Sequence, residues 1–273
     1  MDRAMKAAAT GVGIEIDDGG LARVTLRRGE AGNAIDLDMA RGLLDAARVC
    51  AREAVRVVLL TGEGKSFCVG GDLREFSRFS GEDLEKHLTA VTDALHDALR
   101  MFAASDAPVV AAVQGAVAGA GVGLAAAADV TLAADNASFT AAYTGIGYSP
   151  DAGVSWFLPR LVGPKRALDL LLTNRRVPAA EAAEIGLVSR VVSADRLAAE
   201  AAYTAEALRR GPTAALGATR RLVAAGLTTD LGAHLDHEAR ALVAAAASEA
   251  GREGVAAFLG KRTPDFTHVP PSS

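Results

Sequence analysis

Short runs of apolar residues, separated by glycine and polar turn residues, occupy the first two thirds of the chain. Residues 12–16 and 21–26 flank the sequence DDGG at 17–20, which predicts a β-hairpin because aspartate–glycine pairs favour tight turns. Further apolar runs of strand length predict β-strands at 55–60, 109–113, 130–133, 137–140 and 187–192. Helical patterns separate many of these runs, so a mixed α/β core is expected.

Between the predicted strands, apolar residues recur at the three- and four-residue spacing of amphipathic helices. Asp36 precedes one such pattern at 40–47, and its carboxylate is predicted to accept hydrogen bonds from the first turn of that helix. A long amphipathic helix is predicted over residues 84–102. Shorter helices are predicted after Gly153, after Pro164 and over 177–186.

The character of the chain changes near residue 195. From Asp195 to about residue 259 the pattern is helical throughout, with breaks at Gly211-Pro212 and near Gly226. We therefore predict an α/β core at 1–194 and a helical C-terminal region at 195–273. The tail from Thr263 contains three prolines and is expected to be frayed.

Composition narrows the classes of function. The 273 residues are half apolar and carry a formal net charge of −4 without a dense basic stretch, so nucleic-acid binding is not expected. No apolar run approaches the roughly 20 residues that cross a bilayer, so no membrane association is expected. Cys50 and Cys68 are isolated rather than paired, so neither a disulfide framework nor a metal site is indicated, and a cytoplasmic location fits.

Two glycine-rich segments stand out as candidate chemistry. The first is GEGKSFCVGGDL at 62–73, and the second is QGAVAGAGVGL at 114–124. Each leads from a predicted strand towards a helical pattern, where free N–H groups attract negative charge. We expect Gly71 and Ala120 to supply two N–H donors aimed at one carbonyl oxygen, which is the arrangement of an oxyanion hole. The alternative is that these glycines only permit tight turns and close helix contacts.

Together with the two glycine segments, further motifs extend along nearly the whole chain. They are LRR at 26–28, GNAID at 32–36, LLTNR at 171–175, EIGLV at 184–188 and EGVAAFL at 253–259. With these motifs the chain resembles the crotonase (enoyl-CoA hydratase/isomerase) superfamily. The resemblance implies an α/β spiral of ββα units with a helical C-terminal trimerisation region, a coenzyme A thioester as substrate, and a homotrimer or dimer of trimers. It implies no metal and no cofactor beyond the coenzyme A of the substrate. In the family, loop N–H groups at the positions of Gly71 and Ala120 hold the thioester oxygen and stabilise an enolate.

The resemblance also indicates the type of reaction. Hydratases of the family use two glutamates, but this chain has Gly123 and Tyr143 at the matching positions. Neither residue replaces a carboxylate as a base near neutral pH, so two-glutamate hydration is not expected. Tyr143 is expected to line the acyl pocket instead.

One carboxylate remains, Asp151, in the sequence PDAG at 150–153 followed by WFLPR at 156–160. This stretch most resembles the epoxyphenylacetyl-CoA isomerase branch, in which one carboxylate moves a proton between carbons of the acyl chain. We therefore predict a double-bond isomerase with Asp151 as the proton carrier. The alternative for Asp151 is a helix N-cap, which stabilises a helix by about 1 kcal/mol.

His96 supports a second interpretation of the chemistry. In the 4-chlorobenzoyl-CoA dehalogenase branch, an aspartate matching Asp151 attacks the substrate, and a histidine matching His96 then activates water. A hydrolase or dehalogenase using this pair is the alternative function, and a weakly active coenzyme A-binding member labelled enoyl-CoA hydratase is another. Because His96 shares a helical face with Thr89, Thr92 and Arg100, a solvated surface histidine is the simpler expectation.

Several residues are candidates for binding the coenzyme. Arg27 and Arg28 could bind its phosphates, because guanidinium matches phosphate geometry. The alternative is a pair of exposed charges at a strand end. The resemblance places backbone groups of Ala34, Gly70 and Asp72 around the adenine, and Lys261 where it could reach the nucleotide of a neighbouring subunit. A solvated terminal lysine is the simpler interpretation of Lys261.

Overall fold

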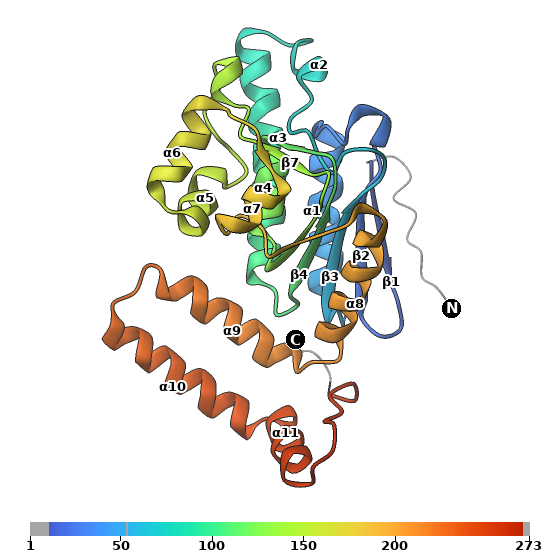
Figure 1. Cartoon of the computed structure of the whole chain (residues 1–273), viewed down its shortest axis with the longest axis vertical. Helices are drawn as coiled ribbons and strands as arrows, with labels where there is room; N and C mark the ends of the chain where they lie inside the picture. Colours follow the sequence, from blue (N-terminus) through green and yellow to red (C-terminus); the bar gives the residue numbers. More distant parts are fainter. Residues whose placement is uncertain (1–10, 53, 270–273) are drawn as a thin grey trace.

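The computed structural model describes residues 11–52 and 54–269. Its centre is a six-stranded sheet with the order β1-β2-β3-β4-β6-β9 (Figure 1). The strands are β1 Val12–Ile16, β2 Leu21–Leu26, β3 Val57–Gly62, β4 Val109–Val113, β6 Val130–Ala134 and β9 Arg190–Val192. The β1–β2 pair is antiparallel, and all the other neighbours are parallel. Every residue of β4 is buried, as expected for a central strand covered on both faces.

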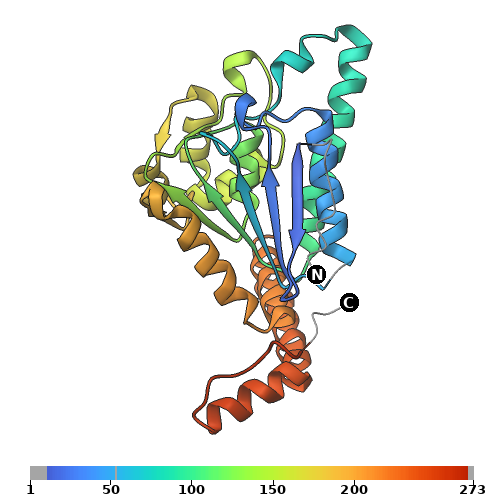
Figure 2. The same ribbon diagram turned by 90° about the vertical axis from the view of Figure 1, so that its right-hand side faces the viewer.

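Helices cover both faces of this sheet. Figure 2 shows α1 and α3 on one side of the strands and α8 on the other, and the buried residues form one cluster on each side. The larger helices of the core are α1 Leu37–Arg52, α3 Gly81–Ala104, α5 Val154–Val162, α6 Pro164–Thr173 and α8 Leu197–Arg209. The shorter ones are α2 Leu73–Phe76, α4 Ala120–Ala127 and α7 Ala179–Glu184.

A second, three-stranded sheet supports the later glycine segment. It consists of β5 Ala116–Ala118, β7 Ser138–Thr140 and β8 Val177–Pro178 in the order β5-β7-β8. Strand β5 was not predicted, because three small residues between glycines carry no strand-length apolar pattern. It pairs in parallel with β7 and, through Val117, forms a bridge with Cys68 in the first glycine segment.

Most predicted elements are confirmed. The hairpin register joins Val12 to Leu26 and Ile16 to Ala22. Asp36 accepts a hydrogen bond of 2.8 Å from the N–H of Met39, as a helix-capping side chain does. The α/β fold class is confirmed as well.

The C-terminal helices differ from the core. Helices α9 Thr213–Gly226, α10 Leu231–Ala247 and α11 Glu249–Leu259 extend away from the sheet (Figure 1). Helix α8 still packs on the sheet through Leu197 and Ala201, so core packing continues past residue 195. The division of the chain into two regions at 195 stays a prediction. The buried guanidinium of Arg56 donates to the carbonyl groups of residues 209, 211, 266 and 269. Fraying of the tail also stays a prediction, and residues 270–273 lie outside the described part.

Within the described residues, no helix is long and apolar enough to cross a membrane.

Candidate active site

The first glycine segment is held against the strand-like residue Ile35. The N–H of Ile35 donates to the carbonyl of Gly70 at 2.7 Å, and the N–H of Asp72 donates to the carbonyl of Ile35 at 2.9 Å. In a parallel bridge of this kind the residue between these partners, Gly71, directs its own N–H away from Ile35. Gly70 has a φ of +93°, which few other residues adopt. The backbone thus fixes the direction of the Gly71 N–H.

The second glycine segment brings the start of α4 against the first. The N–H of Ala118 donates to the carbonyl of Cys68 at 2.9 Å. Gly121 lies so close to Cys68 that a Cβ on Gly121 would be 2.2 Å from that carbonyl oxygen. Ala120 is the first residue of α4, where an N–H has no partner within the helix.

The two segments meet beside these two N–H groups. A Cβ on Gly70 would lie 3.1 Å from the carbonyl oxygen of Ala118 and 3.5 Å from the nitrogen of Ala120. Among the described residues, neither Gly71 nor Ala120 donates its N–H to a backbone or side-chain acceptor. The ring of Phe76 covers Gly71, since a Cβ on that glycine would be 2.7 Å from the ring. Two free donors and an apolar cover are the components of an oxyanion-binding site.

Tyr143 connects this region to Asp151. A Cβ on Gly119, the residue before Ala120, would lie 3.9 Å from the Cζ atom of the Tyr143 ring. The buried Tyr143 hydroxyl donates to Oδ1 of the half-buried Asp151 at 2.5 Å. Burial, and next the charge of Asp151, raise the pKa of Tyr143, so its hydroxyl remains a proton donor. From the sequence, Tyr143 was expected only to line the acyl pocket. Its contact with Asp151 was missed, although a hydroxyl-bearing residue close to Asp151 in the chain was a visible signal.

Asp151 is not the cap of the following helix. Helix α5 begins at Val154, and its N-cap position is Gly153, which has a left-handed conformation. The N–H of Val154 donates to the backbone carbonyl of Asp151 at 3.0 Å, whereas the Asp151 side chain accepts from Tyr143. The helix-cap interpretation is therefore wrong. The Asp151 carboxylate lies against Tyr143, whose ring is close to Gly119 at the N-cap of α4.

His96 lies next to Asp151 and is not a solvated surface side chain. It projects from α3, is half-buried, and accepts a hydrogen bond of 3.1 Å at Nε2 from the N–H of Ala152. Ala152 has a φ of +48°, an unusual conformation for alanine that this bond helps to hold. The expectation of a solvated histidine is wrong because α3 turns that part of its polar face towards the segment before α5.

The position of the first hydratase glutamate is closed. A Cβ on Gly123 would lie 2.3 Å from the carbonyl oxygen and 2.8 Å from the Cβ of Ala152. A contact of 2.3 Å is far inside the van der Waals distance, so this backbone leaves no room for a side chain. Position 123 therefore lacks a carboxylate, and close packing against Ala152 requires a glycine there.

Several of the coenzyme-binding candidates contact one another around the first glycine segment. Arg28 forms ion pairs with Asp72 at 2.8 Å and Asp36 at 3.0 Å, and it also donates to the carbonyl of Ala34. Burial opposes ionisation of Asp72, but the hydrogen bond from Arg28 and two backbone N–H groups give it a net lowered pKa. Arg27 is more exposed and pairs with Glu15 and Glu63.

Among the coenzyme-binding candidates, four lie together: Arg28, Ala34, Gly70 and Asp72. Lys261, by contrast, follows α11, which lies at the opposite end of the molecule from α2 (Figure 1). Lys261 is exposed there.

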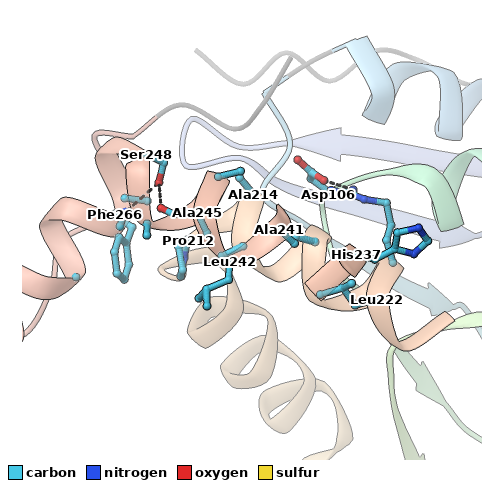
Figure 3. Close-up of a pocket in the computed structure, with 18 of the residues that line it drawn as sticks. Asp106, Pro212, Ala214, Leu222, His237, Ala241, Leu242, Ala245, Ser248 and Phe266 are labelled. Carbon is cyan, nitrogen blue, oxygen red and sulfur yellow. Dashed lines mark hydrogen bonds and ion pairs between the residues drawn. The ribbon is translucent and has the colours of Figure 1, made fainter. Parts of the chain in front are cut away.

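The C-terminal helices line a large, partly open cavity that lies apart from these residues. It has a volume of about 970 Å³ and lies between α9, α10 and α11 (Figure 3). Its lining is mostly alanine and leucine, and its carboxylate, Asp106, is paired with Arg221. A catalytic site needs several convergent polar groups. Since the lining of this cavity is mostly apolar and its carboxylate is already paired, we assign the candidate active site to the region of Gly71, Ala120 and Asp151.

The fold thus brings the two glycine segments and the Tyr143–Asp151 pair into one region of the molecule. A sequence profile of the enoyl-CoA hydratase/isomerase family matches residues 17–269. The chain belongs to this family, so its resemblance to the crotonase superfamily is confirmed.

Relatives within the family carry different names. A "probable enoyl-CoA hydratase" of Rhodobacter capsulatus is 43% identical over 91% of this chain and 95% of its own length. The 1,2-epoxyphenylacetyl-CoA isomerase of Escherichia coli is 35% identical over 91% and 95%, and a 4-chlorobenzoyl coenzyme A dehalogenase of Arthrobacter is 31% identical over 92% and 91%. The crystal structure of an enoyl-CoA hydratase from Polaromonas superposes with a TM-score of 0.86, at 33% identity, over 93% of this chain and 98% of that one.

Proposed function

We propose that the protein is an enoyl-CoA double-bond isomerase in which Asp151 carries the proton. The substrate is a coenzyme A thioester whose carbonyl oxygen accepts hydrogen bonds from the N–H groups of Gly71 and Ala120. The observation that carries the proposal is the Asp151 carboxylate beside α4, held at 2.5 Å by the Tyr143 hydroxyl. The name of the Escherichia coli relative supports the same reaction class.

The reaction needs one base that also acts as an acid. For a 3-enoyl thioester, the Asp151 carboxylate removes a proton from C2, and the electron pair moves into the carbonyl to form a dienolate. The two N–H groups stabilise the negative oxygen, which is often the largest electrostatic contribution to such reactions. The protonated Asp151 then gives the same proton to C4, the double bond moves to C2–C3, and the carbonyl re-forms. No water, oxidant or second carboxylate is consumed.

Two features favour this function over hydration. Hydration by two glutamates requires carboxylates at 123 and 143, and these positions hold a glycine without space for a side chain and a buried tyrosine. Burial and the charge of Asp151 raise the pKa of Tyr143, so it stays protonated near neutral pH and no phenolate is present to act as a base. The "probable enoyl-CoA hydratase" name of the Rhodobacter relative does not outweigh this chemistry.

A hydrolase or dehalogenase with Asp151 as nucleophile and His96 as base is the second candidate. The Arthrobacter relative and the proximity of His96 to Asp151 favour it. Against it, the Nε2 lone pair of His96 already accepts the N–H of Ala152, and a general base needs a free lone pair near the water that it activates.

The test combines Asp151→Asn with deuterium exchange into a panel of acyl-CoA compounds, read by mass spectrometry. We expect the variant to lose exchange and double-bond migration by at least about 10²-fold, while it still binds acyl-CoA. Unchanged turnover would remove Asp151 from the mechanism.

A matched His96→Ala variant distinguishes the two candidate functions. Isomerisation should persist at a reduced rate, whereas hydrolysis through a covalent adduct should stop. An acyl or aryl adduct on Asp151, detected by mass spectrometry, would support the second candidate instead.

We further propose that the nucleotide part of the substrate binds near Arg27, with backbone groups of Ala34, Gly70 and Asp72 around the adenine. Both arginines pair with two carboxylates, but the Arg27 side chain is 41% exposed and its partners Glu15 and Glu63 are exposed, whereas Arg28 is 25% exposed. Arg27 is therefore the more available cation. An Arg27→Gln variant should raise KM for acyl-CoA without lowering kcat, whereas an unchanged KM would argue against this contact.

We also propose that α9–α11 pack against other copies of the chain in a homotrimer or dimer of trimers. Large apolar side chains are exposed on these helices, including Phe258 at 83% and Leu242 at 71%. Exposed apolar surface of this kind marks an interaction site. Such an assembly would also bring Lys261 towards the nucleotide of a neighbouring subunit. Analytical ultracentrifugation showing a monomer at micromolar concentration would contradict the proposal.

A further inference from the structure

The Tyr143 hydroxyl makes a specific contact with the Asp151 carboxylate. The hydroxyl is 2.5 Å from Oδ1 of Asp151 and 3.4 Å from the backbone carbonyl of the same residue. A phenol has a single proton to donate, and the shorter contact receives it. Within the described part of the chain, Oδ2 of Asp151 accepts no hydrogen bond. The two carboxylate oxygens are therefore inequivalent, since one is bound and the other is free.

Hydrogen bonds fix the backbone of Tyr143. Its carbonyl accepts hydrogen bonds from the N–H groups of Ile146 at 3.1 Å and Tyr148 at 3.0 Å, which close a tight turn after this residue. The preceding Ala142 has a φ of +66°, so the chain enters the turn in an uncommon conformation. On the pocket side, Gly119 offers no side chain in the path of the ring. The hydroxyl is therefore held in place before any substrate arrives.

Asp151 is restrained from its other side as well. The next peptide N–H, that of Ala152, is bound by His96 at 3.1 Å. The backbone after Asp151 is thus tied to α3, and its side chain is tied to Tyr143. Without these two contacts, the Asp151 side chain could adopt several rotamers.

We infer that Tyr143 is a positioning residue that binds Oδ1 of Asp151 and leaves Oδ2 as the oxygen that takes and returns the substrate proton. This inference rests on the proposed isomerase function and adds to it. Tyr143 keeps its own proton throughout, because burial and the neighbouring carboxylate both oppose formation of a phenolate. A hydrogen bond to the ionised form of a carboxylate favours that form. Tyr143 therefore stays protonated, binds one oxygen of the base and leaves the other oxygen free.

The first test is the variant Tyr143→Phe, which removes only the hydroxyl. The acid limb of the kcat/KM profile for isomerisation should move to higher pH by about one unit, since the carboxylate loses a hydrogen-bond donor that favours its ionised form. At neutral pH kcat should fall by roughly tenfold, while KM stays within about twofold. Tyr148→Phe is the matched control, because the Tyr148 ring is 39% exposed, and its profile should equal that of the wild type.

A second variant keeps the side chain and changes only its acidity. With 3-fluorotyrosine at position 143, the more acidic phenol donates a stronger hydrogen bond, so the acid limb should move to lower pH. Opposite shifts in the two variants support the inference. A profile that does not move in 3-fluorotyrosine enzyme, or that moves the same way in both, overturns it. If Asp151→Asn retains turnover, the proposed function itself fails. If Asp151→Asn is inactive and the position-143 profiles match the wild type, only the role of Tyr143 fails.

Discussion

The two walls of the candidate site use different parts of the polypeptide. The backbone wall consists of the N–H groups of Gly71 and Ala120, fixed by bridges between strand-like segments. The side-chain wall consists of Tyr143, Asp151 and His96, which come from three separate segments and contact one another directly or through Ala152. Under the proposed function, the backbone wall would serve any reaction that places negative charge on a thioester oxygen. The side-chain wall, by contrast, would decide which bond is made or broken.

The largest effect is expected from removing a donor of the backbone wall without changing its shape. Ala120→Pro deletes the N–H at the first position of α4, where proline is well tolerated. Since one oxyanion donor contributes a factor of about 10²–10³ in kcat, isomerisation should fall by that factor. Ala120→Gly keeps the N–H and is the matched control, with activity near wild type. If the proline variant were as active as the glycine variant, Ala120 would not be a donor.

The backbone wall was easier to predict from the sequence than the side-chain wall. Glycines at 70, 119 and 121 mark places where only a small residue fits, and this is a local signal. The contact between His96 and Ala152 joins residues 56 positions apart, so no local pattern indicates it. The hydrogen bond between Tyr143 and Asp151 joins residues only eight positions apart, but the sequence does not show that their side chains face each other, although the aspartate itself was found from its motif.

The same reason explains which elements were predicted. The hairpin at 12–26, strand β4 and the breaks near residues 211 and 226 follow from periodicity and turn chemistry, which are local. Strand β5 has only three residues and exists because β7 and Cys68 pair with it. The break at Ser248 between α10 and α11 was also missed, because serine is compatible with a helix interior. Here the Ser248 hydroxyl caps the next helix by accepting a hydrogen bond from the N–H of Gly251.

A smaller effect is expected from disturbing the side-chain wall from behind. Gly123→Ala places a Cβ 2.3 Å from the carbonyl oxygen of Ala152, so the segment carrying Asp151 must shift. Overpacking of this kind lowers the free energy of unfolding by about 1–3 kcal/mol, and a shift of the base should reduce kcat by about tenfold. Gly254→Ala in α11 is the control, because its nearest neighbour would be 3.7 Å away.

Denaturant unfolding and isomerisation kinetics measure both effects. Gly123→Glu should introduce no strong hydratase activity, because Tyr143 still occupies the second position. A Gly123→Ala variant with wild-type stability and turnover would show that this contact is not tight.

The smallest effect concerns the ion pairs that anchor the backbone wall. Arg28→Gln removes the partner of Asp72, the residue after Gly71, and should lower the free energy of unfolding by about 1–2 kcal/mol at neutral pH. The folded-state pKa of Asp72 lies below its ordinary value of 3.8, so its stabilising contribution is present above that pH and is lost as the pH falls through the folded pKa. The difference between wild type and variant should therefore shrink on acidification below about pH 4. Urea unfolding at pH 7 and pH 3 measures this, with Arg48→Gln, an exposed i,i+3 pair with Asp45, as the control. A difference that stays the same at pH 7 and pH 3 would mean that Arg28 stabilises the fold through its bond to the carbonyl of Ala34 rather than through Asp72.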